Sequence, residues 1–187
     1  MNTAQTNANR PYPTQYVSPW TMRDGIVVTI RPIRPDDEAC MVKFHETLSE
    51  NSVYLRYFHL ISLGQRTAHQ RLTHVCFNDY DREIALVAEH HDAGTGLTEI
   101  LAIGRLIKIP DTDTAEFALL VGDRFQRQGL GTELLRRLIQ IGRAEHMRHI
   151  VGNVLINNPG MLHVCETLGF RRECAPREDV VTVTLDL

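Results

Sequence analysis

A glycine-rich loop, QRQGLGT at 126–132, is the segment of this chain best suited to hold an anion. It lies between a β-like run at 115–121 and a helix-like run that begins near residue 130. Backbone N–H groups at the start of a helix point outward, and the helix dipole favours negative charge there. The two glycines lack Cβ atoms, so the backbone can approach an anion closely and adopt dihedral angles that other residues avoid. The loop therefore predicts a site for the pyrophosphate of a nucleotide-like cofactor.

Two familiar phosphate motifs do not fit this loop. A dinucleotide-binding fingerprint needs GxGxxG on the first strand-to-helix turn, with an acidic residue about 20 residues later. Here the spacing is QxxGxG, and it occurs late in the chain. The nucleoside triphosphate loop GxxxxGK[ST] is absent. The loop by itself thus indicates phosphate, and the cofactor must be inferred from the rest of the chain.

Hydrophobic periodicity predicts the elements that position the loop. Strands are expected at 25–33, 83–89, 100–109, 115–121, 149–156 and 180–187. Helices are expected at about 35–48, 49–58, 67–77, 129–145 and 159–168, the last ending at Gly169. This order predicts an α+β fold: one domain over 25–187, with a mixed, mostly antiparallel twisted sheet flanked by helices. Residues 1–24 are expected to form an extended arm, which Tyr12, Tyr16 and Trp20 could attach to a surface.

Composition and charge limit the classes of protein to consider. The 187 residues fit one compact domain, and 43% hydrophobic with 23% charged residues is typical of a globular protein. A net charge of −3 gives no electrostatic case for nucleic acid or an anionic membrane as the main partner. No apolar run approaches the roughly 20 residues that span a bilayer, and the N-terminus lacks a signal-peptide pattern. We therefore expect a cytoplasmic protein that binds neither nucleic acid nor membrane.

The cysteines and histidines do not form a recognisable metal site or disulfide framework. Cys40, Cys76, Cys165 and Cys174 are widely spaced without a CxxC pair, so we expect reduced thiols. The histidines form no HExxH motif, and the pair at 90–91 precedes a turn-rich stretch. We therefore expect no metal.

A second motif connects the glycine loop to a known superfamily. In NPGMLHVCETLGF, Asn158 stands eleven residues before Gly169. Together with QRQGLGT, and in this order of elements, it resembles the GNAT superfamily of acyl-CoA N-acyltransferases over about residues 115–172. The segments RPIRPDDE at 31–38 and TLSENSVYLRYF at 47–58 resemble the acetyltransferase domain of bacterial Pat-like protein-lysine acetyltransferases. That extends the similarity to nearly the whole chain after residue 24.

The resemblance implies acetyl-CoA as co-substrate, with its pyrophosphate on the N–H groups of the glycine loop. Thr132 could add a hydroxyl contact, and Arg124 and Arg127 could add charge, although Arg is mostly a solvated surface residue. Without the second motif, the loop could also be a tight turn before a helix. The implied cofactor-binding residues are Leu119, Leu120, Val121, Gln126, Arg127, Gln128, Gly129, Leu130, Gly131, Thr132, Asn158 and Cys165.

Glu116 is the candidate general base. It lies on the strand that enters the loop and resembles the position of the general-base glutamate in Pat-like enzymes. A lysine amine, with a pKa near 10.4, is almost fully protonated at neutral pH, so a nearby carboxylate must take a proton directly or through water. The apolar neighbours at 117–120 predict partial desolvation of this carboxylate, which would make it a better base. In the alternative reading, Glu116 lies on the solvated face of a strand.

The same strand could supply an oxyanion donor. If it splays from the next strand, as the resemblance implies, the N–H of Leu120 or Val121 could bind the thioester carbonyl. Asn158 is expected to contact the CoA arm, to cap the helix that starts at Pro159, or both. Many relatives place a general-acid tyrosine seven residues after this Asn, where this chain has Cys165. We expect this cysteine to pack under CoA, while a thiol acid or an acyl-enzyme nucleophile are alternatives.

Tyr54, Arg56 and Tyr57 are candidates for acceptor binding because their helix is expected to line the acceptor side; ordinary amphipathic packing is the alternative. Glu46 and Glu50 nearby could favour a cationic lysine. The leading hypothesis is an N-acetyltransferase that acts on exposed lysines of proteins, with an acyl-CoA synthetase as one candidate partner. The alternatives are a small-amine acetyltransferase, for a polyamine or amino acid, and a non-catalytic acyl-CoA-binding sensor.

Overall fold

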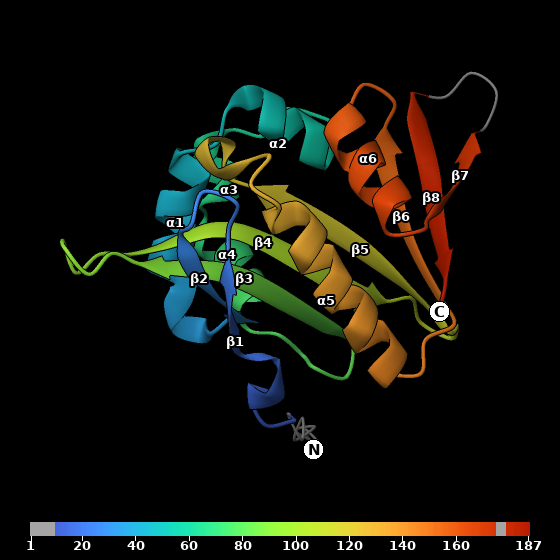
Figure 1. Cartoon of the computed structure of the whole chain (residues 1–187), viewed down its shortest axis with the longest axis horizontal. Helices are drawn as coiled ribbons and strands as arrows, with labels where there is room; N and C mark the ends of the chain where they lie inside the picture. The colour runs from blue at the N-terminus through green and yellow to red at the C-terminus, as the bar shows by residue number, and fades with distance from the viewer. Residues whose placement is uncertain (1–9, 175–178) are drawn as a thin grey trace, which may run out of the picture.

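The computed structural model describes residues 10–174 and 179–187 and contains an eight-stranded sheet (Figure 1). The strand order is β1-β2-β3-β4-β5-β6-β8-β7, and the strands of every neighbouring pair are antiparallel except β5 and β6, which are parallel. The strands are β1 (Ser18–Thr21), β2 (Val27–Pro32), β3 (Glu83–His91), β4 (Thr98–Lys108), β5 (Thr114–Val121), β6 (His149–Leu155), β7 (Arg171–Cys174) and β8 (Val180–Asp186). The predicted α+β class and mostly antiparallel sheet are confirmed.

Six α-helices and three short 3₁₀ turns connect the strands. The helices are α1 (Glu38–Glu46), α2 (Glu50–Tyr57), α3 (Leu63–Arg66), α4 (His69–Cys76), α5 (Leu130–Ala144) and α6 (Pro159–Thr167). The 3₁₀ turns are η1 (Thr14–Tyr16), η2 (Pro35–Asp37) and η3 (Asp123–Phe125). All five predicted helices occur within a few residues of their expected bounds. Among the described residues, no helix is long and apolar enough to cross a bilayer.

The helices form one layer on each face of the sheet. The buried leucines of α5 pack with α6 and the sheet in one core, whereas α1, α2 and α4 cover the opposite face with a second core. In Figure 1, α5 crosses the near face of the sheet. Alternation along β5 sends Phe117 into the first core and Leu120 into the second. Odd-numbered side chains of β5 therefore lie on the face covered by α5, and even-numbered ones lie on the face covered by α1, α2 and α4.

The structure adds elements that the sequence pattern did not predict, namely β1, α3 and β7. Residues 18–21 of the expected arm pair with β2, from Ser18 opposite Ile30 to Thr21 opposite Val27. The arm is therefore part of the sheet over this stretch, while its residues 1–9 lie outside the described chain. Each added element has only four residues. Such short segments show too little periodicity to be recognised.

The two central parallel strands separate along most of their length. The pairing of β5 with β6 covers three positions and ends at Glu116 opposite Val151, although both strands continue. At the next position, the Phe117 ring covers Gly152, where an added Cβ would lie 2.3 Å from Cε1 of that ring. The same ring packs edge-on against Phe170, with centroids 5.3 Å apart. Glycine at 152 thus makes room for an aromatic ring where the strands begin to diverge.

Substituting Gly152→Ala should lower the free energy of unfolding by about 1–3 kcal/mol, because the methyl group forces the Phe117 ring out of a packed core. Urea denaturation measures the effect. Gly160→Ala is the matched control, since its Cβ would meet only Asn158 Oδ1 at 3.8 Å. A loss of stability equal to that of the control would show that the close contact at 152 is relieved without cost.

Candidate active site

The glycine loop connects η3 to α5 with a left-handed turn. Gly129 is the residue before the helix and has a φ of +93°, and Arg127 has a φ of +61°. Among the described groups of the protein, none accepts a hydrogen bond from the backbone N–H groups of residues 127–132. These donors therefore stay available at the positive end of the α5 dipole. The residues present fit a pyrophosphate group.

The arm at 20–23 braces this loop from one side. The Arg23 backbone N–H donates to the Gln128 carbonyl at 3.3 Å, and its guanidinium donates to the Arg127 carbonyl at 3.4 Å. The Trp20 ring, partly buried against the core, lies 3.1 Å from the position of a Cβ on Gly129. The predicted attachment of the arm through Trp20 is confirmed, and the surface it contacts is the glycine loop itself.

Helix α2 braces the loop from the other side. Ser49 caps α2 by accepting from the Ser52 N–H, as predicted, and both serine hydroxyls donate to the Asp123 carboxylate at 2.6 and 3.0 Å. Burial works to raise the pKa of Asp123, but the hydrogen bonds from the two serines outweigh it and lower that pKa. The Gln126 amide then donates to the Ser52 hydroxyl at 3.0 Å and to the Val121 carbonyl at 3.3 Å. Sequence reasoning missed Asp123, because its partners are more than 70 residues away.

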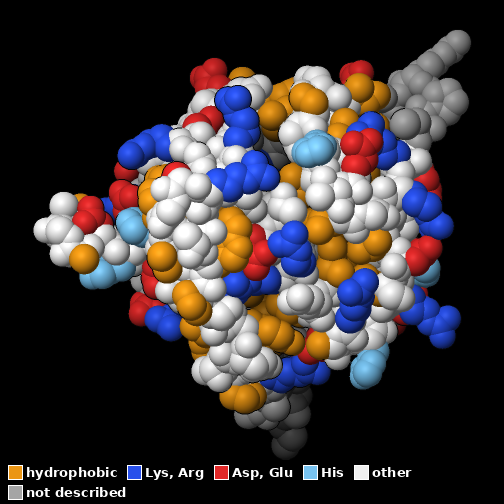
Figure 2. All heavy atoms as spheres, viewed as in Figure 1, with side chains coloured by type: hydrophobic (Ala, Val, Ile, Leu, Met, Phe, Trp, Pro, Cys, Tyr) orange, Lys and Arg blue, Asp and Glu red, His pale blue; other side chains and the backbone are white. Residues whose placement is uncertain are grey.

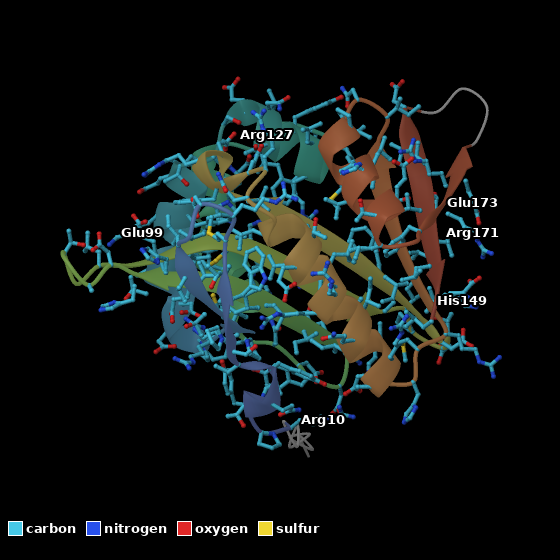
Figure 3. The ribbon with its side chains drawn as sticks, in the orientation of Figure 1. Arg10, Glu99, Arg127, His149, Arg171 and Glu173 are labelled. Carbon is cyan, nitrogen blue, oxygen red and sulfur yellow. The ribbon has the colours of Figure 1, made fainter. Side chains whose placement is uncertain are left out.

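Basic side chains lie near the loop and remain exposed. Arg127 is at the top of the view in Figure 3, beside α2, and Lys and Arg side chains gather over the same part of the near face in Figure 2. Arg124 is also exposed, with its guanidinium 5.4 Å from the Phe125 ring centre. Thr132 lies in the first turn of α5, while the Leu130 side chain is buried in the core. The loop therefore offers backbone donors first, with arginines free to add charge.

Substituting Gly129→Ala should raise the KM for acetyl-CoA about tenfold, because a left-handed conformation costs a residue with a Cβ roughly 1–2 kcal/mol and the loop must move to relieve it. Steady-state kinetics measures the change. Gly96→Ala imposes similar strain, with a φ of +70°, at the distant β3–β4 hairpin. An unchanged KM in the 129 variant would mean that the loop does not hold the cofactor.

The register of β5 decides which of its N–H groups face the opening beside β6. Gly122 donates to the Leu101 carbonyl at 2.9 Å, and the Thr114 carbonyl accepts from Ile109 at 2.9 Å. In an antiparallel ladder the groups alternate, so even-numbered residues of β5 bond β4. The expectation that Leu120 offers a free N–H is therefore wrong. Leu119 and Val121 point their N–H groups toward the side where β6 has diverged, and the Val121 carbonyl bonds Gln126 from that side.

Glu116 is the last residue of β5 paired with β6, and its side chain lies on the face covered by α1, α2 and α4. The side chain is exposed, so the predicted desolvation is wrong. Alternation explains the error, since apolar Phe117 and Leu119 point to the other face of the sheet. The charge of Glu116 acts on the Arg56 guanidinium. The pKa of Arg56 is lowered, chiefly by burial and further by the charges of Arg105 and Arg71, whereas Tyr57 and Glu116 act to raise it.

The second motif folds as a capped helix. The Asn158 side-chain oxygen accepts from the Met161 N–H at 3.1 Å at the start of α6, so the capping role is confirmed. Cys165, on the same helix, is 0% exposed within the core, and burial raises the pKa of its thiol to about 12. A thiol with this pKa carries almost no thiolate at neutral pH. Contact between Cys165 and a cofactor would also require α6 to shift.

The acceptor-binding candidates on α2 differ in their exposure to solvent. Tyr54 is exposed, whereas Arg56 and Tyr57 are half-buried beside a cavity of about 40 Å³. That cavity also receives Arg71 from α4 and Arg105 from β4, neither of which any sequence motif indicated. The predicted acidic neighbours, Glu46 and Glu50, are exposed and do not line the cavity. The immediate environment is therefore basic.

A larger cavity of about 410 Å³ lies near the C-terminal end of α5, between Tyr12, Tyr80 and Glu145, well away from the glycine loop. Among the side chains that the structure describes, no three of His, Cys, Asp or Glu come together as a metal ion requires. The chemistry is thus concentrated around the loop and the diverging strands.

Comparison with known proteins identifies the fold and the family. The profile of the Acetyltransferase (GNAT) family matches residues 53–170. An acetyltransferase of Pseudomonas aeruginosa is 29% identical over 150 residues, which is 80% of this chain and 78% of that protein. The GNAT domain of S. lividans PAT superposes with a TM-score of 0.82 at 29% identity, covering 94% of this chain and 99% of that one.

A more distant structure has the same fold. RimJ of Mycobacterium smegmatis, in complex with CoA-disulfide, superposes with a TM-score of 0.70 at 17% identity, covering 91% of this chain and 86% of that one. The resemblance predicted from the paired motifs is confirmed. The chain belongs to the acetyltransferase (GNAT) family and is an N-acyltransferase of that fold.

Proposed function

We propose that this acetyltransferase transfers the acetyl group of acetyl-CoA directly to lysine side chains of proteins, with Glu116 as the general base. The observation that carries the proposal is the divergence of β5 from β6 directly after Glu116 and Val151. The glycine loop lies at the end of β5, where the strands have diverged, and the carboxylate lies where they still meet. The likeness to S. lividans PAT over 94% of the chain supports a protein acceptor.

Binding begins at the glycine loop in this proposal. The free N–H groups of 127–132 hold the pyrophosphate, with added charge from Arg127, and acetyl-CoA supplies an activated thioester. The Gln126 side chain donates hydrogen bonds to Ser52 and Val121 and so holds the loop against the end of β5. Trp20 and Arg23 hold the loop from the arm.

The reacting groups then come from β5. The Leu119 N–H, which is aimed away from β4 and is nearer to Glu116 than the Val121 N–H, donates to the thioester carbonyl as negative charge develops on its oxygen. Glu116 takes a proton from the lysine ammonium, directly or through water, because the protonated amine cannot attack. The neutral amine nitrogen bonds the acetyl carbon, the carbon–sulfur bond breaks, and the second proton of that nitrogen passes through water to the departing thiolate. Cys165 is not used as an acid, because it is buried in the core.

Rates of thiol release with matched acceptors test the proposal. A lysine-containing peptide, spermidine and a free amino acid are each supplied with acetyl-CoA at equal concentration. The proposal expects the peptide to be turned over fastest. Faster turnover of spermidine or the amino acid, without acetylation of any peptide lysine, would replace it with the small-amine alternative. If the protein binds acetyl-CoA but releases no CoA thiol in the presence of any acceptor, the acyl-CoA-binding sensor is favoured.

A further inference from the structure

Three arginines surround the small cavity next to Glu116. Arg56 comes from α2, Arg71 from α4 and Arg105 from β4, and Ala118 and Leu120 of β5 line the same cavity. Ala118 is two residues beyond Glu116 on the same face, which is roughly 7 Å along a strand. The cluster therefore lies within reach of an acceptor whose amine meets Glu116.

One tyrosine holds two of these guanidinium groups in place. The Arg56 guanidinium lies 4.9 Å from the centre of the Tyr57 ring, and that of Arg71 lies 5.1 Å from the same centre. The negative potential of an aromatic face attracts each cation, and the flat guanidinium loses little further freedom on binding a carboxylate. Tyr57 thus holds two like charges beside the same ring before any ligand arrives.

The charges of Arg56 and Arg71 are not balanced within the described protein. Arg105 pairs with Glu83, but neither Arg56 nor Arg71 makes an ion pair or a side-chain hydrogen bond with any described residue. His45 lies beside them and is 3% exposed. Burial, then Arg66, Arg71 and Arg56, lowers the pKa of His45 to about 4, so it is neutral at physiological pH. The described residues that line the cavity include no carboxylate, and Glu83 pairs only with Arg105, so the guanidinium groups of Arg56 and Arg71 have no ion-pair partner.

Half-buried cations without partners are costly, since burial removes water that would otherwise stabilise them. An incoming carboxylate offsets that cost and fits the guanidinium fork with two hydrogen bonds. A polyamine has the wrong charge for this cavity, and an acidic group close to the acceptor amine has the right one. These observations give the cluster a role in acceptor choice.

We propose that Arg56 and Arg71 bind a carboxylate of the acceptor, placed within one or two residues of the amine that is acetylated. This inference rests on the proposed function only in that Glu116 marks where the amine lies. The carboxylate comes from an acidic side chain beside a protein lysine or from the α-carboxylate of an amino acid. The experiments below separate these two sources.

The first experiment measures carboxylate binding without turnover. Protein containing isotope-labelled arginine is titrated with glutarate, or with neutral glutaramide as the matched probe, while the Nε–H signals are followed by NMR. Glutarate should shift the signals of Arg56 and Arg71, which are assigned by their loss in Arg56→Gln and Arg71→Gln. Shifts of equal size with glutaramide, or none with glutarate, would overturn the proposal.

The second experiment measures acceptor preference. Lysine peptides that differ only by Glu or Gln beside the lysine are compared by kcat/KM, and free lysine is compared with lysine amide. The wild type should prefer the acidic acceptor about tenfold, and Arg71→Gln should remove most of that preference. Arg71→Lys should keep part of it, because the charge remains while the fork is lost. Arg143→Gln, an exposed position on α5, is the control that should retain the full preference.

The outcomes separate this inference from the proposed function. If no lysine peptide is acetylated while glutarate still shifts the two arginine signals, the lysine assignment fails and the carboxylate site stands. A preference confined to free lysine over its amide assigns the carboxylate to an amino acid. If lysine peptides are acetylated equally well with Glu or Gln and glutarate shifts neither signal, the carboxylate site fails and the proposed function stands.

Discussion

Replacing Glu116 by glutamine should lower kcat with a lysine peptide by about 10²- to 10⁴-fold at neutral pH, the range expected for loss of a general base. Glutamine keeps the size and polarity of the side chain and removes its ability to take a proton. The side chain is exposed, so the substitution should leave stability nearly unchanged. Acetyl-CoA binding should also persist, since the loop at 126–132 is untouched.

The pH dependence of this variant makes the prediction specific. Without a base, the reaction depends on the fraction of lysine that is already neutral, which rises tenfold per pH unit up to about pH 10. The deficit of Glu116→Gln should therefore shrink as the pH is raised. Glu99→Gln is the control, because Glu99 is exposed at the hairpin end of β4, away from the loop (Figure 3). A deficit that stays constant with pH, or a rate equal to that of wild type, would remove Glu116 from this role.

Replacing Arg31 by methionine should lower the free energy of unfolding by about 3–5 kcal/mol, the cost of leaving buried carboxylates without their cation. The Arg31 side chain is 3% exposed, and its guanidinium donates to both Asp37 carboxylate oxygens at 2.7 Å. It also donates to Glu89 on β3 and to the Pro32 carbonyl at 3.1 Å. Burial alone would lower the pKa of Arg31, but the hydrogen bonds that it donates to Asp37 and Glu89 raise it, so the group stays charged.

The ion pairs of Arg31 connect strand β2 with strand β3 and with the turn η2 that precedes α1. Asp37 also accepts from the Arg34 N–H at 2.7 Å, so the carboxylate fixes the turn that starts α1. Urea denaturation measures the loss, and Arg82→Met, at a side chain that is 85% exposed, should change stability by less than about 0.5 kcal/mol. Equal stability of the Arg31 variant and wild type would show that the carboxylates find other partners or water.

The segment around Arg31 could be predicted from the sequence only in part. The resemblance of RPIRPDDE to Pat-like domains marked the segment as characteristic, but the partner Glu89 is 58 residues away. Local patterns predicted the strand, the helix start and the Ser49 cap because each depends on nearby residues. A bidentate ion pair between distant elements depends on the tertiary fold, which no local pattern reports.

The candidate site could likewise be predicted from the sequence only in part. The glycine loop, Glu116 and the Asn158 cap were predicted from motifs that are continuous in sequence. The length of the β5–β6 pairing was not, since it depends on Phe117 meeting Gly152 across the sheet. The direction of the Leu120 N–H required the register with β4. Arg71 of α4 meets Arg56 of α2 only in the tertiary fold, where both guanidinium groups lie over the Tyr57 ring, and its own sequence context is that of an ordinary surface arginine.

Mapping of newly acetylated lysines tests the central claim most directly. Wild-type protein and Glu116→Gln are each incubated with isotope-labelled acetyl-CoA and a cell extract, and labelled acetyl-lysines are identified by mass spectrometry. The account predicts a defined set of labelled protein lysines with wild type that is lost or strongly reduced with the variant. Labelled small amines without labelled protein lysines, or the same lysines labelled equally by both proteins, would contradict it.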